Sequence, residues 1–139
     1  MRVMQPVLHI TSTHDATQPG ALFVWEGALD HSPAAADDCL IFGPWDHHGA
    51  ASSTQLPSLG GVDFTDAAVL DINEIHKRWF DRWLLGSGKP GAGWPRASVF
   101  FTGTPMVVRE RRAAKGRLRA LVPAQLRQRS DRGRGRQAR

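Results

Sequence analysis

Acidic and imidazole side chains follow two apolar runs of this sequence. Asp46, His47 and His48 come directly after LIFGPW at positions 40 to 45, and Asp15 follows PVLHITS at positions 6 to 12. A buried carboxylate can fix the tautomer of an imidazole, which can then accept the proton of a serine hydroxyl. An acid and a histidine in this order are two of the three groups of a Ser-Asp-His relay.

Two other interpretations fit the same residues. His14, Asp15, Asp46, His47 and His48 are all metal-ligand types. Adjacent histidines in a turn rarely face one ion, however, and no HExxH pattern occurs. In the third interpretation, Asp15 caps the following turn or helix and the histidines are solvated. The relay is the interpretation we favour.

The elements that must position these residues alternate along the chain. The sequence predicts strands at 6–12, 38–45 and 97–103, helices at 20–29 and 65–86, a Gly-Pro-Trp turn at the end of the second strand, and a loop at 49–61. This order predicts parallel strands joined by crossovers, hence an α/β fold. Chemistry in such sheets lies at the carboxyl ends of the strands. The loops after the first two strands should therefore lie side by side.

The longest predicted element is the helix at 65–86, TDAAVLDINEIHKRWFDRWLLG. Thr65 or Asp66 is expected to cap its start, and Gly86 to end it. Its apolar stripe is expected to consist of Ile72, Ile75, Trp79 and Trp83, widened by Val69 and Phe80.

Length and composition limit the class of protein. A chain of 139 residues fits one domain but is short for a complete α/β enzyme. Its one cysteine, Cys39, cannot form an intrachain disulfide. No apolar run has membrane-spanning or signal-peptide length, so we expect a cytoplasmic protein without a membrane partner.

Charge divides the chain near Met106. Residues 1–106 carry 6 Lys/Arg against 11 Asp/Glu, a net charge of −5, whereas residues 107–139 carry 12 against 2, a net charge of +10. Residues 1–104 are expected to fold, and residues 105–139 to form a disordered basic tail. An arginine-rich arm for nucleic acid or an acidic surface is the alternative. The tail lacks aromatic residues for base stacking, so nucleic acid is not the expected partner.

Five segments resemble one family of enzymes: VLHITSTHDATQPG, LIFGPWDHHG, GGVDF, LDINEIHKRWFDRWLLG and ASVFFTG. Over roughly residues 5 to 104 the chain is similar to the later part of the catalytic domain of CocE/NonD hydrolases. These are the cocaine esterase and X-Pro dipeptidyl-peptidase group of α/β-hydrolases. The resemblance implies that Asp15, the aspartate of D-x-x-x-x-G, is the triad acid. It also implies that His47, the histidine of G-P-W-x-H, is the base.

The same resemblance places the serine nucleophile upstream of Met1, and no G-x-S-x-G pattern occurs in this chain. We therefore expect part of an α/β-hydrolase fold that acts on small ester, amide or X-Pro peptide substrates once a missing N-terminal segment joins it. No metal or organic cofactor is expected, and the isolated chain should be inactive. The alternative function is a binding protein whose basic tail is the active part.

Overall fold

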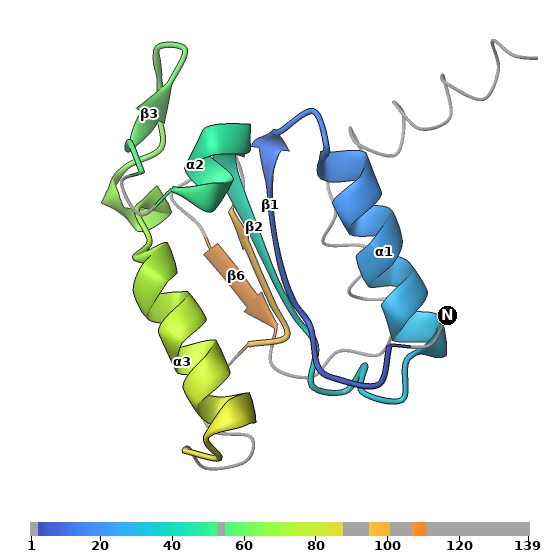
Figure 1. Ribbon diagram of the computed structural model, residues 1–139. Helices are drawn as coiled ribbons and strands as arrows, with labels where there is room; N and C mark the ends of the chain where they lie inside the picture. The colour runs from blue at the N-terminus through green and yellow to red at the C-terminus, as the bar shows by residue number, and fades with distance from the viewer. Residues whose placement is uncertain (1–2, 53–54, 88–94, 101–106, 111–139) are drawn as a thin grey trace, which may run out of the picture.

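A four-stranded sheet forms the centre of the protein (Figure 1). The computed structural model describes residues 3–52, 55–87, 95–100 and 107–110. The strands lie in the order β1-β2-β5-β6. Their bounds are β1 Leu8–His14, β2 Cys39–Asp46, β5 Ala97–Phe100 and β6 Val107–Glu110. The first three are parallel and β6 is antiparallel to β5, so the described residues form an α/β arrangement.

Two long helices pack on opposite faces of this sheet (Figure 1). Helix α1 (Gln18–His31) connects β1 to β2, and α3 (Ile72–Leu84) lies between β2 and β5 in the chain. The α1 side of the sheet has a core of Leu22, Trp25, Leu29, Leu40, Phe42, Ala97 and Val99. The other side buries Ile41, Trp45 and Ala50, with Leu8, Ile10, Leu70 and Ile75 packed against them. Alternate residues of β2 therefore serve two separate cores, which explains its continuous apolar run.

Strand β2 contains the Gly-Pro-Trp segment, which the sequence predicts as a turn. Ser12 pairs with Gly43, but His14 pairs with Asp46, so β2 has one residue more than β1 over this interval. Such a bulge suits Pro44, which has no backbone N–H for the ladder. Strand β1 also extends through His14, beyond its predicted end at residue 12.

The region after β2 is more regular than the predicted loop at 49–61. A short helix, α2 (His47–Ala51), follows β2 directly. A hairpin of β3 (Ser58–Leu59) and β4 (Val62–Asp63) comes next. Its turn residues Gly60 and Gly61 have φ angles of 58° and 81°, which glycine adopts without strain.

The predicted helix at 65–86 is two elements. A 3₁₀ turn, η1 (Asp66–Ala68), precedes α3, which begins at Ile72. Asp71 is its N-cap, and its Oδ1 accepts a hydrogen bond of 2.9 Å from the Glu74 N–H. The predicted caps, Thr65 and Asp66, are therefore wrong, whereas Gly86, with φ of 63°, follows the end of α3 as predicted.

The apolar stripe of α3 is narrower than the sequence predicts. Ile72 and Trp79 are buried, and Ile75 and Trp83 are partly buried. Val69 and Phe80, predicted to widen the stripe, are exposed. Val69 lies before the helix begins, so it does not share the helical face of the other residues.

The last described segments differ in part from expectation. Strand β5 covers the first four residues of the strand predicted at 97–103, and residues 101–106 lie outside the described part. Strand β6 lies within the segment expected to be disordered, and residues 111–139 are likewise outside the described part. No helix in the described residues is long and apolar enough to span a membrane.

Candidate catalytic site

Asp15 and His47 meet at the carboxyl end of the parallel strands. The His47 Nδ1 lies 3.1 Å from the Asp15 Oδ1. The Asp15 side chain is 5% exposed, whereas that of His47 is 67% exposed. A carboxylate on Nδ1 favours the tautomer with the proton on that nitrogen, which leaves the Nε2 lone pair available to accept a proton.

The bulge in β2 accounts for this contact. His14 is paired with Asp46. The residues that follow these two, Asp15 and His47, therefore lie beside each other. Without the extra residue in β2, His14 would pair with Trp45, and Asp15 would lie beside Asp46. The register of the two strands therefore selects which side chain meets Asp15.

Local hydrogen bonds hold Asp15 in place. Its Oδ1 accepts a hydrogen bond of 2.7 Å from the Thr17 N–H and another of 2.7 Å from the Thr17 hydroxyl. Burial raises the pKa of Asp15, but the two Thr17 bonds and the neighbouring His47 together outweigh it, so the pKa lies below its usual value. Asp15 is therefore ionised at neutral pH. Its carboxylate both closes the turn with Thr17 and contacts His47.

Asp46 fixes the start of the helix that carries His47. Its Oδ1 accepts a hydrogen bond of 2.8 Å from the Gly49 N–H, as an N-cap residue does. Its backbone carbonyl accepts a hydrogen bond of 3.2 Å from the Ser12 hydroxyl, which ties β1 to the same corner. The carboxylate of Asp46 thus has a structural role next to the base.

Trp45 connects the end of β2 to the neighbouring elements. Its indole Nε1 donates a hydrogen bond of 2.7 Å to the carbonyl of Ala68, and the ring packs with Ile41 and with Ala50 of α2. The indole therefore joins β2, α2 and η1, and it limits the motion of the segment that presents His47.

The other candidate ligands make contacts that do not form a metal site with Asp15 and His47. His14 is exposed and stacks on Phe64, with ring centroids 6.2 Å apart. His48 is exposed, and its ring lies edge-on to that of His47 at a centroid distance of 6.2 Å. All five candidate ligands belong to the described part of the chain, where no three His, Cys, Asp or Glu side chains are grouped to hold a metal ion. The metal-site interpretation therefore has no support in this geometry.

No serine in the described part of the chain bonds to His47, whose ring has Asp15 as its hydrogen-bond partner there. Ser12, the nearest serine to Asp15 in the sequence, is fully buried, and its hydroxyl is bonded to Asp46. The pair consequently consists of a carboxylate and an imidazole, with no serine hydroxyl bonded to it among the described residues.

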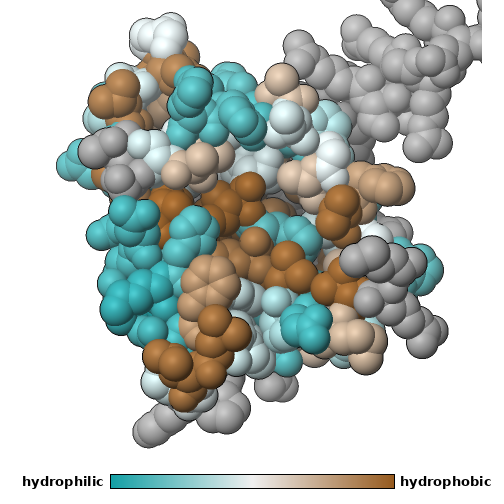
Figure 2. Space-filling model, in the orientation of Figure 1, coloured by the Kyte–Doolittle hydropathy of each residue, from teal (hydrophilic) through white to brown (hydrophobic). Residues whose placement is uncertain are grey.

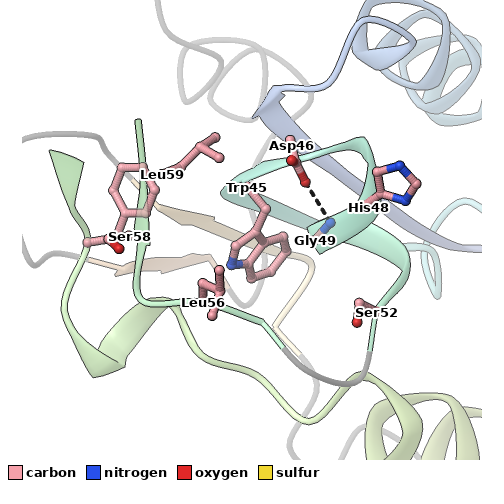
Figure 3. Close-up of a pocket in the computed structure, with 9 residues that line it drawn as sticks. Trp45, Asp46, His48, Gly49, Ser52, Leu56, Ser58 and Leu59 are labelled. Carbon is pink, nitrogen blue, oxygen red and sulfur yellow. Dashed lines mark hydrogen bonds between the residues drawn. The ribbon is translucent and has the colours of Figure 1, made fainter. Parts of the chain in front are cut away.

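A small cavity lies beside α2 (Figure 3). Its volume is about 180 Å³, and it is lined by Trp45, Asp46, His48, Gly49, Ser52, Leu56, Ser58, Leu59 and Phe64. No local pattern in the sequence indicates this cavity, because its walls come from β2, α2 and the β3–β4 region. The role of Thr17 was also missed, although the Asp-x-Thr spacing at positions 15 to 17 is typical of a turn closed by a side chain.

The sequence matches no protein-family model, and no curated protein matches it either.

Proposed function

We propose that this chain supplies the acid and the base of a serine hydrolase that cleaves ester or amide bonds. The observation that carries the proposal is the hydrogen bond between buried Asp15 and exposed His47. In this proposal the four-stranded sheet is part of an α/β-hydrolase fold, and the serine belongs to a further segment. The resemblance of the Asp15 and His47 motifs to CocE/NonD hydrolases supports the same assignment.

The chemistry follows from the tautomer that Asp15 imposes. His47 Nε2 accepts the proton of the serine hydroxyl as its oxygen attacks the substrate carbonyl, and Asp15 stabilises the imidazolium that forms. His47 then returns the proton to the leaving oxygen or nitrogen, which departs and leaves an acyl-serine ester. Water attacks this ester in the second half-reaction, with His47 again as base, and the acid product and the free serine result.

The edge of the sheet supports a further segment. Strand β1 is the end strand of the described sheet, so its outer backbone groups have no ladder partner there. Figure 2 shows apolar side chains gathered between the two long helices on the viewed face. Exposed apolar residues also occur on both helices: Phe23 and Val24 on α1, and Phe80 and Leu84 on α3. A strand added at β1 would pair its outer backbone groups, and helices that flank this strand would cover apolar groups on either face.

A complementation experiment tests the proposal. The 139-residue chain is mixed with a segment encoded upstream that contains G-x-S-x-G, and a fluorophosphonate probe measures serine labelling. We expect labelling and ester turnover only when both parts are present. His47→Ala should remove most of this activity, and His31→Ala, an exposed histidine at the end of α1, should leave it unchanged.

Two results would overturn the proposal. One is stoichiometric labelling of the 139-residue chain alone at one of its own serines, which would require another catalytic arrangement. The other is full activity of the His47→Ala variant in the complemented enzyme.

A further inference from the structure

We infer that the cavity beside α2 is a subsite for a small, uncharged apolar group of the substrate, such as a phenyl or short branched alkyl group. This inference rests on the proposed hydrolase function for its role, and it names the substrate class. The binding of such a group can be tested without any catalytic activity.

The position of the cavity relates it to His47. Asp46, His48 and Gly49 line the cavity, and they are the residues on either side of His47 in the chain. The ring of His48 lies at a centroid distance of 6.2 Å from the ring of His47. The cavity is therefore next to the segment that carries the candidate base, although His47 itself is not among its lining residues.

The walls of the cavity indicate the chemistry of its occupant. Its large side chains are apolar: Trp45, Leu56, Leu59 and Phe64. Its polar side chains are Ser52, Ser58, His48 and Asp46. The carboxylate of Asp46 already accepts a hydrogen bond from the Gly49 N–H. A negative charge would be repelled by Asp46, and no Lys or Arg side chain is among the lining residues. These walls favour an uncharged apolar group.

Size limits the occupant further. A volume of about 180 Å³ is close to that of an apolar protein cavity of roughly 150 Å³ that binds benzene. A phenyl ring or a branched chain of a few carbon atoms fits this volume. We therefore expect esters or amides with one compact hydrocarbon group.

Two of the large side chains that line the cavity are held in place. Trp45 is bonded to the Ala68 carbonyl. Phe64 is buried between the rings of His14 and Phe100, at centroid distances of 6.2 Å and 6.1 Å, and its N–H donates a hydrogen bond of 2.6 Å to the Pro57 carbonyl. A preformed apolar wall lowers the entropic cost of binding.

A titration of the 139-residue chain with benzyl alcohol tests the inference directly. The readout is the NMR signals of the Trp45 indole N–H, assigned with Trp45→Phe, and of the Gly49 N–H. We expect saturable shifts of both signals in the wild type. Leu59→Trp, which fills the cavity, should weaken binding at least tenfold, and Leu84→Trp, the same change at an exposed site on α3, should not.

A second variant guards against loss of folding. If Leu59→Trp loses its far-UV circular dichroism, Ser58→Trp replaces it, because Ser58 is an exposed rim residue. Absence of saturable shifts in the wild type, or unchanged binding in a folded cavity-filled variant, would overturn the inference.

Kinetics with the complemented enzyme separate this inference from the proposed function. We expect Leu59→Trp to lower kcat/KM for benzyl acetate at least tenfold and to leave kcat/KM for methyl acetate unchanged. Equal losses for both esters would refute a subsite for the larger group. Binding of benzyl alcohol without turnover of any ester would instead refute the hydrolase function and leave the cavity as a binding site.

Discussion

Asp15 and His47 lie 32 positions apart in the sequence and share a contact of 3.1 Å between Oδ1 and Nδ1. The contact joins the ends of two adjacent parallel strands, and it depends on one extra residue in β2. A buried acid that is already fixed by Thr17 thus meets a ring whose other nitrogen remains accessible. This is the arrangement that a general base requires.

Asp15→Asn should change the tautomer of His47. The amide cannot accept the Nδ1 proton with the strength of a carboxylate, so we expect the population with the proton on Nε2 to rise. Nitrogen-15 NMR of the imidazole rings measures this directly in the 139-residue chain. Asp66→Asn, the same change at an exposed position in η1, is the control. An unchanged His47 tautomer in Asp15→Asn would contradict the assigned contact.

The same substitution should lower kcat of the complemented hydrolase by about 10³ to 10⁴, because the wrong tautomer cannot accept the serine proton. KM should change less, since Asp15 is not expected to touch substrate. Activity within twofold of wild type would show that Asp15 has only its turn-forming role with Thr17.

Buried His9 should make stability depend on pH. Burial lowers its pKa from 6.5 to about 4, and its Nε2 has no hydrogen-bond partner among the described residues. Between these values the unfolded chain binds a proton that the folded chain does not, so stability falls as pH falls from about 6.5 to 4. The loss from His9 is at most about 3 kcal/mol. Urea unfolding at several pH values should show a flatter curve for His9→Met than for His76→Met, an exposed control.

Asp15 contributes in a different range. Its pKa is lowered in the folded state, so its stabilisation is complete above the unfolded value of about 3.9 and is lost only as pH falls through the folded value. The difference between wild type and Asp15→Asn in urea unfolding should therefore persist from pH 7 to about 5 and shrink below about pH 4. A difference that disappeared near pH 6 would contradict this assignment.

Gly43→Ala should destabilise the protein by about 1 to 3 kcal/mol through overpacking. A Cβ at this position would meet the ring of Trp45, which is fixed by its bond to Ala68. Gly27→Ala, within α1, is the matched control, because a Cβ at this position would have nothing within 4 Å. That change should instead stabilise by about 0.5 to 1 kcal/mol. Equal effects of the two changes in urea unfolding would refute the close packing of Trp45 on Gly43.

Asp71→Ala should cost about 1 kcal/mol of unfolding free energy, because it removes the carboxylate that caps α3 at the Glu74 N–H. Asp66→Ala should cost less than about 0.5 kcal/mol, since Asp66 lies outside this helix. The reverse order in urea unfolding would show that the helix begins at residue 65 or 66 after all.

Local sequence determined the elements and the candidate residues. Short apolar runs placed the strands at β1, β2 and β5, and longer apolar patterns placed the helices at α1 and α3, because each pattern buries one face or both of its own element. The alternation of these elements also predicted a parallel sheet, with Asp15 and the histidines at one edge. The catalytic role of Asp15 and His47 stays a prediction until the complementation experiment is done.

Boundaries within long apolar patterns were less well determined. The predicted helix at 65–86 combined η1 and α3. Periodicity alone does not reveal that a residue inside an apolar pattern, such as Asp71, caps a new helix. Competition between Thr65, Asp66 and Asp71 is decided by the left-handed backbone of Thr65, with φ of 64°, and by which backbone N–H each side chain reaches.

Only the tertiary structure decided which residue meets Asp15 and what surrounds the pair. The one-residue bulge in β2 places His47, and not Asp46, beside Asp15, and it arises from strand pairing rather than from either strand by itself. The cavity likewise forms only where β2, α2 and the β3–β4 region pack together. The physical reason is that register and enclosed volume depend on contacts between segments far apart in the chain, whereas a local pattern records only the face that each segment buries.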